Sequence, residues 1–419
     1  MKKFIIILSC MMTINVYAQT IDIQMLYQKA IQNYPLAKQK ETLANIGELK
    51  IKSLNMNYLP QVNINGQLSY QSEVTKLPIK LPFVSIPETS KDMYKLTLDV
   101  NQLIWDGGMN SSQKKLEEIN TLSEQQNLEI ELYKLKERVN LFYFNCLMLQ
   151  QNIELLEISQ KDIQAKLLKI ESAVKNGVQN ESNADNLKAE IIKIEQKIIE
   201  ANSGKLASIL MLSELCGVEI TDNSKFYLPE LALNSTSFEN LRPELKSFEL
   251  NKNKLSITSS VLSSKLMPKI YSFGQLGYGR PGLNMLSNDF QSFYMVGAKL
   301  SWNIWNWNQT KTDRKIIELQ KDLINIAKDT YQKNSKISYQ RDLAEMDKFS
   351  ALMLKDLEII DLRTKIAKNS SSQFDNGYIT SSDYLNDVNA ATQSKINYEM
   401  HRIQLIKAKC DYLVNSGKL

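Results

Sequence analysis

The chain repeats one pattern twice, and this repeat constrains its fold more strongly than any other feature of the sequence. Four segments of the first half recur in the second half, at offsets of 208 residues for the first two pairs and 200 for the last two. The pairs are Tyr58–Gln61 with Leu266–Lys269, Gly66–Tyr70 with Gly274–Tyr278, Leu103–Asp106 with Asn303–Asn306, and Asn176–Gly177 with Asn376–Gly377. Self-similarity of this kind indicates two copies of one structural unit.

We therefore predict a first repeat over residues 19–220, a linker over residues 221–237 and a second repeat over residues 238–419. The linker contains Pro229 and turn-forming residues. Each repeat carries the same predicted order of elements: short helix, strand, loop, strand, long helix, tip and returning helix.

Long helices are predicted by apolar residues that recur every 3.5 residues on average, a spacing typical of left-handed coiled-coil packing. In the first repeat this stripe consists of Leu128, Leu132, Leu135, Val139, Phe142, Cys146, Leu149, Ile153, Leu156, Ile163, Leu167, Ile170 and Val174. A weaker stripe in the second repeat consists of Leu343, Met346, Met353, Leu357, Ile360 and Ala367. Only 14 Gly and 9 Pro occur among 419 residues, so little interrupts these helices. A helix of about 60 residues starting at Asn110 or Lys311 would span roughly 90 Å.

Four segments of about ten residues alternate apolar and polar side chains, which predicts β-strands with two different faces. They start near Val62, Tyr94, Ile270 and Tyr294, and the last is expected to continue to Ile304. Such segments with aromatic ends are typical of membrane strands, apolar toward lipid and polar toward a lumen. A half-buried soluble sheet is the alternative, but no helix is left over to cover it.

Four strands are too few to close a membrane barrel, because open sheet edges are not tolerated in lipid and the smallest barrels have about eight strands. The chain must therefore associate with copies of itself. Two copies would give eight strands and three would give twelve.

The first 18 residues are predicted to be a secretory signal peptide, with Lys2 and Lys3 before an apolar run and cleavage after Ala18. Lipidation at Cys10 is the alternative, although the apolar run before it is short. No other stretch is long and apolar enough for a membrane helix. The cysteines that remain after cleavage lie in helical patterns, which favours buried free thiols.

Several kinds of chemistry are excluded by composition. The single histidine, His401, cannot form a two-histidine metal site, and we expect no serine–histidine or cysteine–histidine catalytic set. The four cysteines show no CxxC spacing, and a net charge of +5 provides no basic field for nucleic acid. We expect no enzyme activity, no cofactor and no metal.

With these elements in order, the chain resembles the TolC-type outer-membrane efflux proteins over essentially its whole mature length. The residues that carry the resemblance are Ala30–Pro35, Leu241–Leu245, Leu59–Pro60, Met267–Pro268, Trp105–Gly108 and Gly377–Leu385. The resemblance implies a mainly α protein with membrane β-structure: a trimeric 12-stranded β-barrel continued by a long periplasmic α-helical barrel, with two structural repeats per chain. It also implies a homotrimer that conducts substrates from a periplasmic adaptor and an inner-membrane pump across the outer-membrane lipid. The pump, rather than the conduit, is expected to choose the substrate.

The resemblance places function at the two helical tips. Residues Gly177, Val178, Gly377 and Tyr378 are expected to contact the adaptor. The tunnel constriction is expected to involve Asp383, Asp387, Asn386, Asp185 and Phe374. A ring of Asp383 copies around a symmetry axis would attract cations. Alternatively, Asp383 merely caps the returning helix, with Ser381 or Ser382 as other caps. Phe374 and Ile379 stand where the family has a tyrosine and a basic residue, so the polar lock is weakened or rebuilt.

All four tryptophans, Trp105, Trp302, Trp305 and Trp307, fall at or just after the ends of the second and fourth strands. Tryptophan favours the membrane–water boundary because it combines an apolar body with a polar edge, whereas core packing is the alternative. A secreted soluble coiled-coil scaffold or adhesin is the rival function. It explains the helical stripes but not four amphipathic strands that share a repeat.

Overall fold

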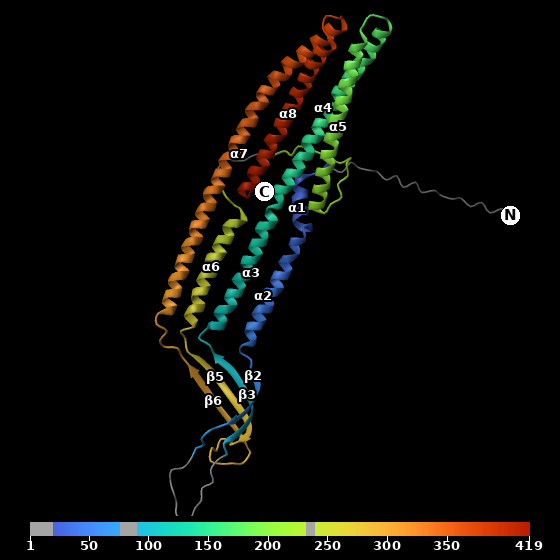
Figure 1. The fold of residues 1–419 in the computed structure, drawn as a ribbon. Coiled ribbons are helices and arrows are strands. Elements are labelled where there is room, and N and C mark those ends of the chain that lie inside the picture. The colour runs from blue at the N-terminus through green and yellow to red at the C-terminus, as the bar shows by residue number, and fades with distance from the viewer. Residues whose placement is uncertain (1–19, 76–89, 232–238) are drawn as a thin grey trace, which may run out of the picture. The chain divides into compact units, whose positions relative to one another are not determined.

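The computed structural model describes residues 20–75, 90–231 and 239–419 (Figure 1). The predicted signal peptide, including Cys10, and part of the predicted linker lie outside these residues. The helices are α1 (Ile23–Asn33), α2 (Gln39–Met56), α3 (Met109–Tyr133), α4 (Leu135–Lys175), α5 (Glu181–Cys216), α6 (Pro243–Ser264), α7 (Gln309–Asp375) and α8 (Ser381–Ser416). The strands are β1 (Thr20–Ile21), β2 (Gln61–Tyr70), β3 (Asp92–Trp105), β4 (Lys225–Phe226), β5 (Lys269–Arg280) and β6 (Gln291–Ser301). No helix among the described residues is long and apolar enough to span a membrane.

The chain forms two compact units, each built from both halves of the sequence. The tip unit comprises the described residues within Met1–Ala37, Leu128–Pro243 and Thr330–Leu419. The sheet unit comprises residues Lys38–Asn127 and Glu244–Asp329. Helices α3 and α7 contribute to both units, so the division in space differs from the predicted division of the sequence into repeats.

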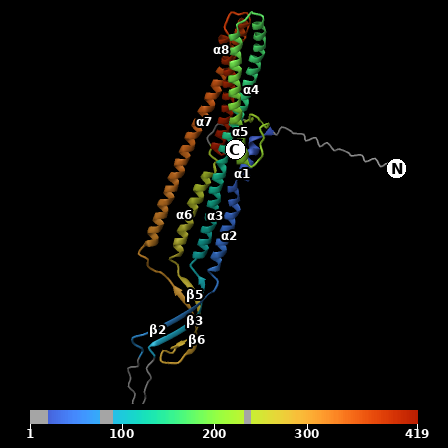
Figure 2. The same cartoon turned by 45° about the vertical axis from the view of Figure 1, so that its right-hand side comes forward.

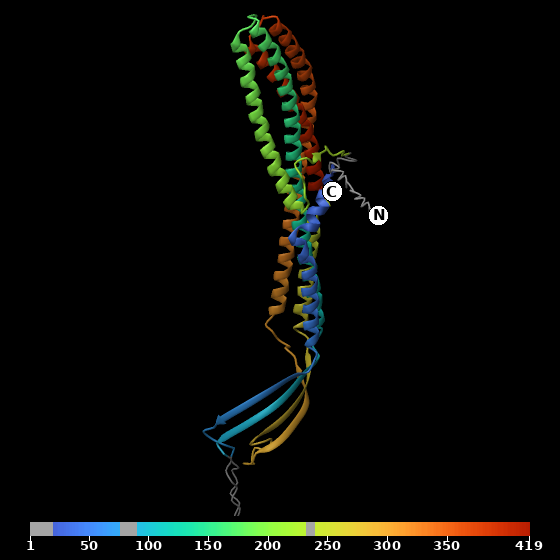
Figure 3. The same cartoon turned by 90° about the vertical axis from the view of Figure 1, so that its right-hand side faces the viewer.

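The sheet unit contains a four-stranded antiparallel sheet with the order β2-β3-β5-β6. Its two hairpins, one from each half of the chain, join through β3 and β5, and the strands bend together as a curved layer (Figure 3). Because the sheet is not closed, β2 and β6 are its two edges. The predicted two-faced strands are confirmed, with one correction. The fourth strand ends at Ser301, so Ile304 lies beyond it.

Cross-strand partners share a face of a sheet, and the register therefore assigns every side chain to one of two faces. One face is apolar and is built from pairs such as Ile64 with Leu98 and Leu276 with Tyr294. Ile64 and Tyr294 are each 73% exposed, so the described residues leave much of this face uncovered. The opposite face carries polar residues, including Asn65, which is paired with Thr97.

Four helical segments of the sheet unit lie side by side next to the sheet, in the order α2, α3, α6 and the first part of α7 (Figure 1). Asp106, only 3% exposed, links sheet and helix. Its carboxylate accepts hydrogen bonds from the backbone N–H groups of Gly108 at 3.0 Å and Asn110 at 2.7 Å, which caps the start of α3. Gly107 has φ +70°, and a Cβ there would collide with Met267. The Trp105–Gly108 motif is therefore a strand-to-helix turn.

The tip unit contains two helical hairpins, α4–α5 and the second part of α7 with α8, whose turns lie at the same end of the unit (Figure 2). The predicted stripe on α4 is its core: Val139, Cys146 and Ile163 are each 0% exposed. A short parallel pair, β1 with β4, lies beside this bundle and was not anticipated from the sequence. It consists of only two residues per strand, too few for a periodic signal.

The predicted long helices differ between the repeats. In the second repeat α7 runs without interruption for 67 residues. In the first repeat the expected single helix is interrupted at Lys134, between α3 and α4. The break is local, because the N–H of Lys134 still donates to the Ile130 carbonyl at 3.3 Å. It lies close to residue 128, where the chain passes from one unit to the other.

Candidate functional site at the helical tips

Both tip turns end their long helices by the same backbone device. Gly177 and Gly377 adopt left-handed conformations, with φ of +69° and +75°. The next residue in each turn donates its N–H back into the helix, from Val178 to the Ala173 carbonyl and from Tyr378 to the Gln373 carbonyl, both at 2.9 Å. These are the bonds of a Schellman cap, which favours glycine because positive φ strains other residues. The Asn176–Gly177 and Asn376–Gly377 pairs that repeat in the sequence are therefore the ends of α4 and α7.

The caps leave two side chains largely exposed to solvent at the tips. Val178 is 75% exposed and Tyr378 is 81% exposed. Neither contributes to the core of the unit, so both are available to a partner.

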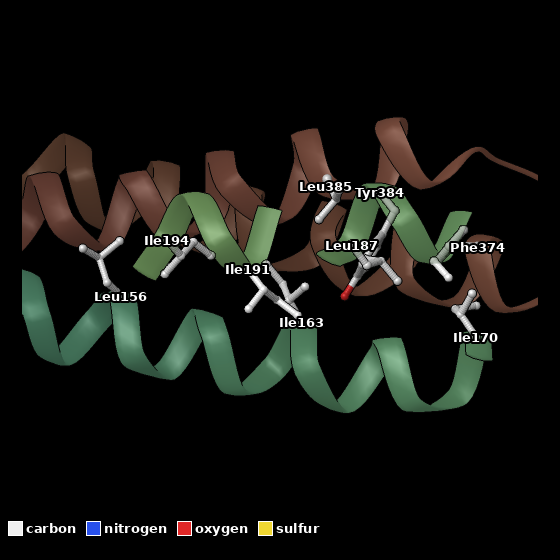
Figure 4. Close-up of a cluster of buried hydrophobic side chains, with 10 residues drawn as sticks. Leu156, Ile163, Ile170, Leu187, Ile191, Ile194, Phe374, Tyr384 and Leu385 are labelled. Atoms are coloured by element: carbon white, nitrogen blue, oxygen red, sulfur yellow. The ribbon is translucent and has the colours of Figure 1, made fainter. Parts of the chain in front are cut away.

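A compact apolar cluster lies directly beneath the turns (Figure 4). Its buried members are Leu156, Ile163, Ile170, Ala184, Leu187, Ile191, Ile194, Phe374, Tyr384 and Leu385. Because they come from α4, α5, α7 and α8, the cluster joins the two hairpins. Phe374 is 0% exposed and stacks on Tyr384, with ring centroids 5.1 Å apart. The Phe374 side chain therefore belongs to the packing under the tips.

A buried lysine connects the hairpins beside this cluster. Lys166 on α4 is 7% exposed and donates to the Asp375 carboxylate at 2.8 Å and to the Ser371 hydroxyl at 2.7 Å, both near the end of α7. Its ammonium also lies 5.2 Å from the centroid of the Tyr384 ring on α8. Burial raises the pKa of Tyr384 to about 12, so the phenol remains neutral beside the lysine.

Sequence reasoning did not identify Lys166, although a signal was available. The lysine stands three residues after Ile163 and four before Ile170, on the side of α4 that carries the apolar stripe. Burying an ammonium group on this apolar side of the helix costs free energy unless it is paired. The position therefore indicates that hydrogen-bond acceptors lie on the helix that packs against it, and Asp375 and Ser371 of α7 are those acceptors.

Asp383 completes a capping box at the start of α8. The N-cap residue is Thr380, rather than Asp383, Ser381 or Ser382 as the capping alternative supposed. Thr380 accepts from the Asp383 N–H at 3.2 Å, while the Asp383 carboxylate accepts from the Thr380 hydroxyl at 2.7 Å and N–H at 3.2 Å. These hydrogen bonds hold the pKa of Asp383 below its usual range. The carboxylate is exposed and therefore presents its negative charge to solvent.

The other predicted constriction residues are not gathered around Asp383 within one chain. Asn386 is exposed, whereas Asp387 is half-buried and accepts a hydrogen bond from Ser370 on α7. Asp185 is exposed on α5, 3.9 Å from the Lys188 ammonium. A common constriction would need the same residues from further copies.

Polar side chains tie the two returning helices together just behind the tips. Asn186 on α5 donates to the Ser381 hydroxyl on α8 at 2.9 Å, and the Ser381 N–H donates to Asn183 at 3.4 Å. Farther along, Asn389 donates to Glu190 at 2.9 Å. The tip region is thus held by Lys166 on one side and by these amides on the other.

In the sheet unit, all four tryptophans are at least 44% exposed, so none packs in a core of this chain. Trp302 donates its indole N–H to the Leu266 carbonyl at 3.0 Å. Trp305 and Trp307 meet edge to face with centroids 5.9 Å apart and are 67% and 84% exposed. Their place at the sheet–helix boundary agrees with an interfacial role, which stays a prediction.

Comparison with known proteins finds one sequence family that matches part of the chain and several solved structures with the same fold. The sequence family described as outer membrane efflux protein matches residues 26–218. No curated protein matches the chain.

Three solved structures are similar over nearly their whole length. The CmeC outer membrane channel of Campylobacter jejuni has 13% identity and a TM-score of 0.66, covering 94% of this chain and 85% of its own. The outer membrane protein VceC of Vibrio cholerae has 10% identity and a TM-score of 0.68, covering 95% and 97%. The open state of the MtrE outer membrane channel of Neisseria gonorrhoeae has 14% identity and a TM-score of 0.67, covering 95% and 89%. This chain has their fold.

Proposed function

We propose that this chain, which belongs to the outer membrane efflux protein family, is the outer-membrane channel of a tripartite efflux or type I secretion system. It is a channel protein rather than an enzyme, and it is a protein of the bacterial outer membrane that extends into the periplasm. The observation that carries the proposal is the open, two-faced sheet, since an apolar face and two unpaired edges cannot remain uncovered.

The edges of the sheet are complementary. Because all neighbours in β2-β3-β5-β6 are antiparallel, β2 and β6 run in opposite directions. The β6 of one copy can therefore pair with the β2 of the next and continue the antiparallel pattern. Three copies of four strands close a 12-stranded barrel, in line with the homotrimer that the family implies.

The helices attached to the edge strands support the same assembly. Helix α2 precedes β2 and helix α7 follows β6. On α7, Leu319 and Leu323 are 57% and 65% exposed, and on α2, Leu49 is 64% exposed. When β6 meets β2 of a neighbour, these bare apolar faces approach each other as well.

The faces of such a barrel have distinct partners. Its apolar face would contact outer-membrane lipid, with the exposed Trp305 and Trp307 at the membrane boundary. In the tip unit, Val178 and Tyr378, exposed beside Gly177 and Gly377, would contact a periplasmic adaptor that delivers substrate from an inner-membrane pump.

The tunnel constriction is assigned to the tips, where Asp383 would form an acidic ring. The bonds of Lys166 to Asp375 and Ser371 support a rebuilt polar lock, because they fasten α4 to the end of α7. Opening the tips would separate the hairpins and break these bonds. Asn386, Asp387 and Asp185 would line the same region from successive copies.

The test is reconstitution of the full-length processed protein into planar lipid bilayers. A conduit is expected to produce discrete conductance steps, and the protein should leave membranes only with detergent. Protein that is soluble without detergent and gives no steps would instead favour the secreted coiled-coil scaffold or adhesin.

A further inference from the structure

The polar face of the sheet is divided into two chemically different halves. Strands β2 and β3 present amides, hydroxyls and a carboxylate, among them Asn65, Thr97 and Asp99. On the same face, strands β5 and β6 present aromatic rings, including Phe273 and Phe293. Aromatic rings are unexpected on a face that should line water.

Each of these two rings lies over a glycine of the neighbouring strand. Phe293 is paired across the strands with Gly277, and Phe273 with Gly297. A Cβ on Gly277 would collide with the Phe293 ring, and one on Gly297 would lie 2.7 Å from the Phe273 Cζ atom. The rings therefore lie on the glycine backbone, and both phenylalanines remain half-exposed.

A lysine accompanies each ring. The Lys95 ammonium lies 5.4 Å from the centroid of Phe293. Lys299 lies two residues after Gly297 in β6. It is therefore on the same face of the sheet as Gly297 and the Phe273 ring that covers it. Both lysine side chains are exposed. One cation thus lies over the Phe293 ring, and a second lies on the same face of the sheet as the Phe273 ring.

The acidic residue between these groups is already satisfied. The Asp99 carboxylate accepts hydrogen bonds from Asn65 and Gln275, each at 2.5 Å, and from the Thr97 hydroxyl at 2.9 Å. Asp99 therefore has its acceptors occupied by neutral donors. Lys95 is close enough to interact with it electrostatically, but within the described part of the chain neither Lys95 nor Lys299 forms an ion pair with it. The two ammonium groups could therefore attract a passing anion.

We propose that Phe273, Phe293, Lys95 and Lys299 form a weak binding strip for planar aromatic anions on the lumen wall, a property that rests on the proposed conduit function. A flat ring would stack against the exposed part of a phenyl ring while its carboxylate or sulfonate meets the neighbouring ammonium. Weak attachment suits a conduit, because a passing solute must bind well enough to enter and loosely enough to leave.

The experiment uses single-channel recording of the full-length protein in planar bilayers. The probe is 1-naphthalenesulfonate, and methanesulfonate, which has the same charge without a ring, is the control. Naphthalenesulfonate is expected to interrupt the current of the wild type in a concentration-dependent way, whereas methanesulfonate is not.

Two double variants separate the ring from the charge. Phe273→Leu/Phe293→Leu keeps an apolar side chain over each glycine but removes the stacking face, and Lys95→Gln/Lys299→Gln removes the charge. Each should weaken the block about tenfold or more, equivalent to about 1.4 kcal/mol, measured relative to the unblocked current of the same variant. Equal block in wild type and variants, or equal block by methanesulfonate, would overturn the strip while leaving the channel intact. Absence of any channel would overturn the proposed function and the strip with it.

Discussion

Helices α4 and α7 are counterparts in the two repeats, yet their apolar side chains have different surroundings. On α4, Val139 and Ile163 are 0% exposed, and Ile163 packs in a cluster with side chains of α5, α7 and α8 of the same chain. On α7, Met346 is 7% exposed and packs against α8, but Leu357 is 50% exposed, and Leu319 and Leu323 nearer the sheet are 57% and 65% exposed. An apolar helix face therefore predicts packing without telling whether the partner belongs to the same chain. Here the apolar face of α4 is covered within the chain, whereas part of the apolar surface of α7 is left for a neighbouring copy.

The largest effect is expected from a charge on the bare face of α7. Leu323→Glu should prevent assembly, because an unpaired carboxylate in an apolar interface is strongly disfavoured. Gln320→Glu adds the same charge at another exposed position of the helix and should leave assembly intact. Native mass spectrometry of the detergent-solubilised protein distinguishes them, and assembled Leu323→Glu would show that this face is not the seam.

The covered stripe should respond differently, through stability of the fold. Ile163→Ala empties space in the core of the tip unit and should cost about 2–5 kcal/mol. Leu168→Ala removes a similar side chain that is 65% exposed on the same helix and should cost clearly less. Thermal unfolding followed by circular dichroism measures both. Equal losses would contradict the contrast between covered and bare faces.

The features that could be predicted from the sequence are those to which many residues contribute. Periodicity identified the long helices and the two-faced strands, because a stripe of many residues averages over local exceptions. The interruption at Lys134, the end of β6 at Ser301 and the β1–β4 pair were not predicted, since each depends on a few residues and their tertiary contacts. The residues at the tips follow the same rule.

At the tips, the glycine turns were predictable because positive φ leaves a clear residue preference. The lysine lock was not, since Lys166 and Asp375 are 209 residues apart and only the packing of α4 against α7 joins them. Thr380 was likewise overlooked as the N-cap, although Thr380 followed three residues later by an acidic side chain is a capping-box pattern.

A smaller effect is expected from breaking this lock. Lys166→Met removes the bonds to Asp375 and Ser371 while keeping a long apolar side chain among its neighbours. Because Asp375 remains 45% exposed and can be hydrated, the fold should survive, and the channel should open more often. Lys169→Met on the exposed side of α4 is the control. Bilayer recordings with unchanged open probability in both variants would remove Lys166 from the gate.

Asp383 should set ion preference rather than assembly. Asp383→Asn is expected to reduce the preference for cations, measured as the reversal potential in a salt gradient. Thr380→Val removes the hydroxyl bond that contributes most to the lowered pKa of Asp383. The carboxylate would then take up its proton at a higher pH, so cation preference should disappear earlier as the pH falls. If ion selectivity is the same in both variants as in the wild type, the role of Asp383 is limited to capping α8.

The smallest signal is expected from the tryptophans. In variants that retain only Trp305 or Trp307, fluorescence should be reduced by quenchers attached to lipid near the headgroups. Neither residue is buried in this chain, so packing within the chain cannot shield them. Quenching by aqueous iodide alone would place both residues away from the bilayer.

We propose that one chain, with its open sheet and the exposed Leu319 and Leu323 of α7, forms one third of a closed tunnel. This can be tested by measuring the mass of the full-length processed protein, extracted from membranes in detergent and kept intact in native mass spectrometry. We expect a single species of three copies. A monomer, or a species of another copy number, would show that the chain does not form such a tunnel.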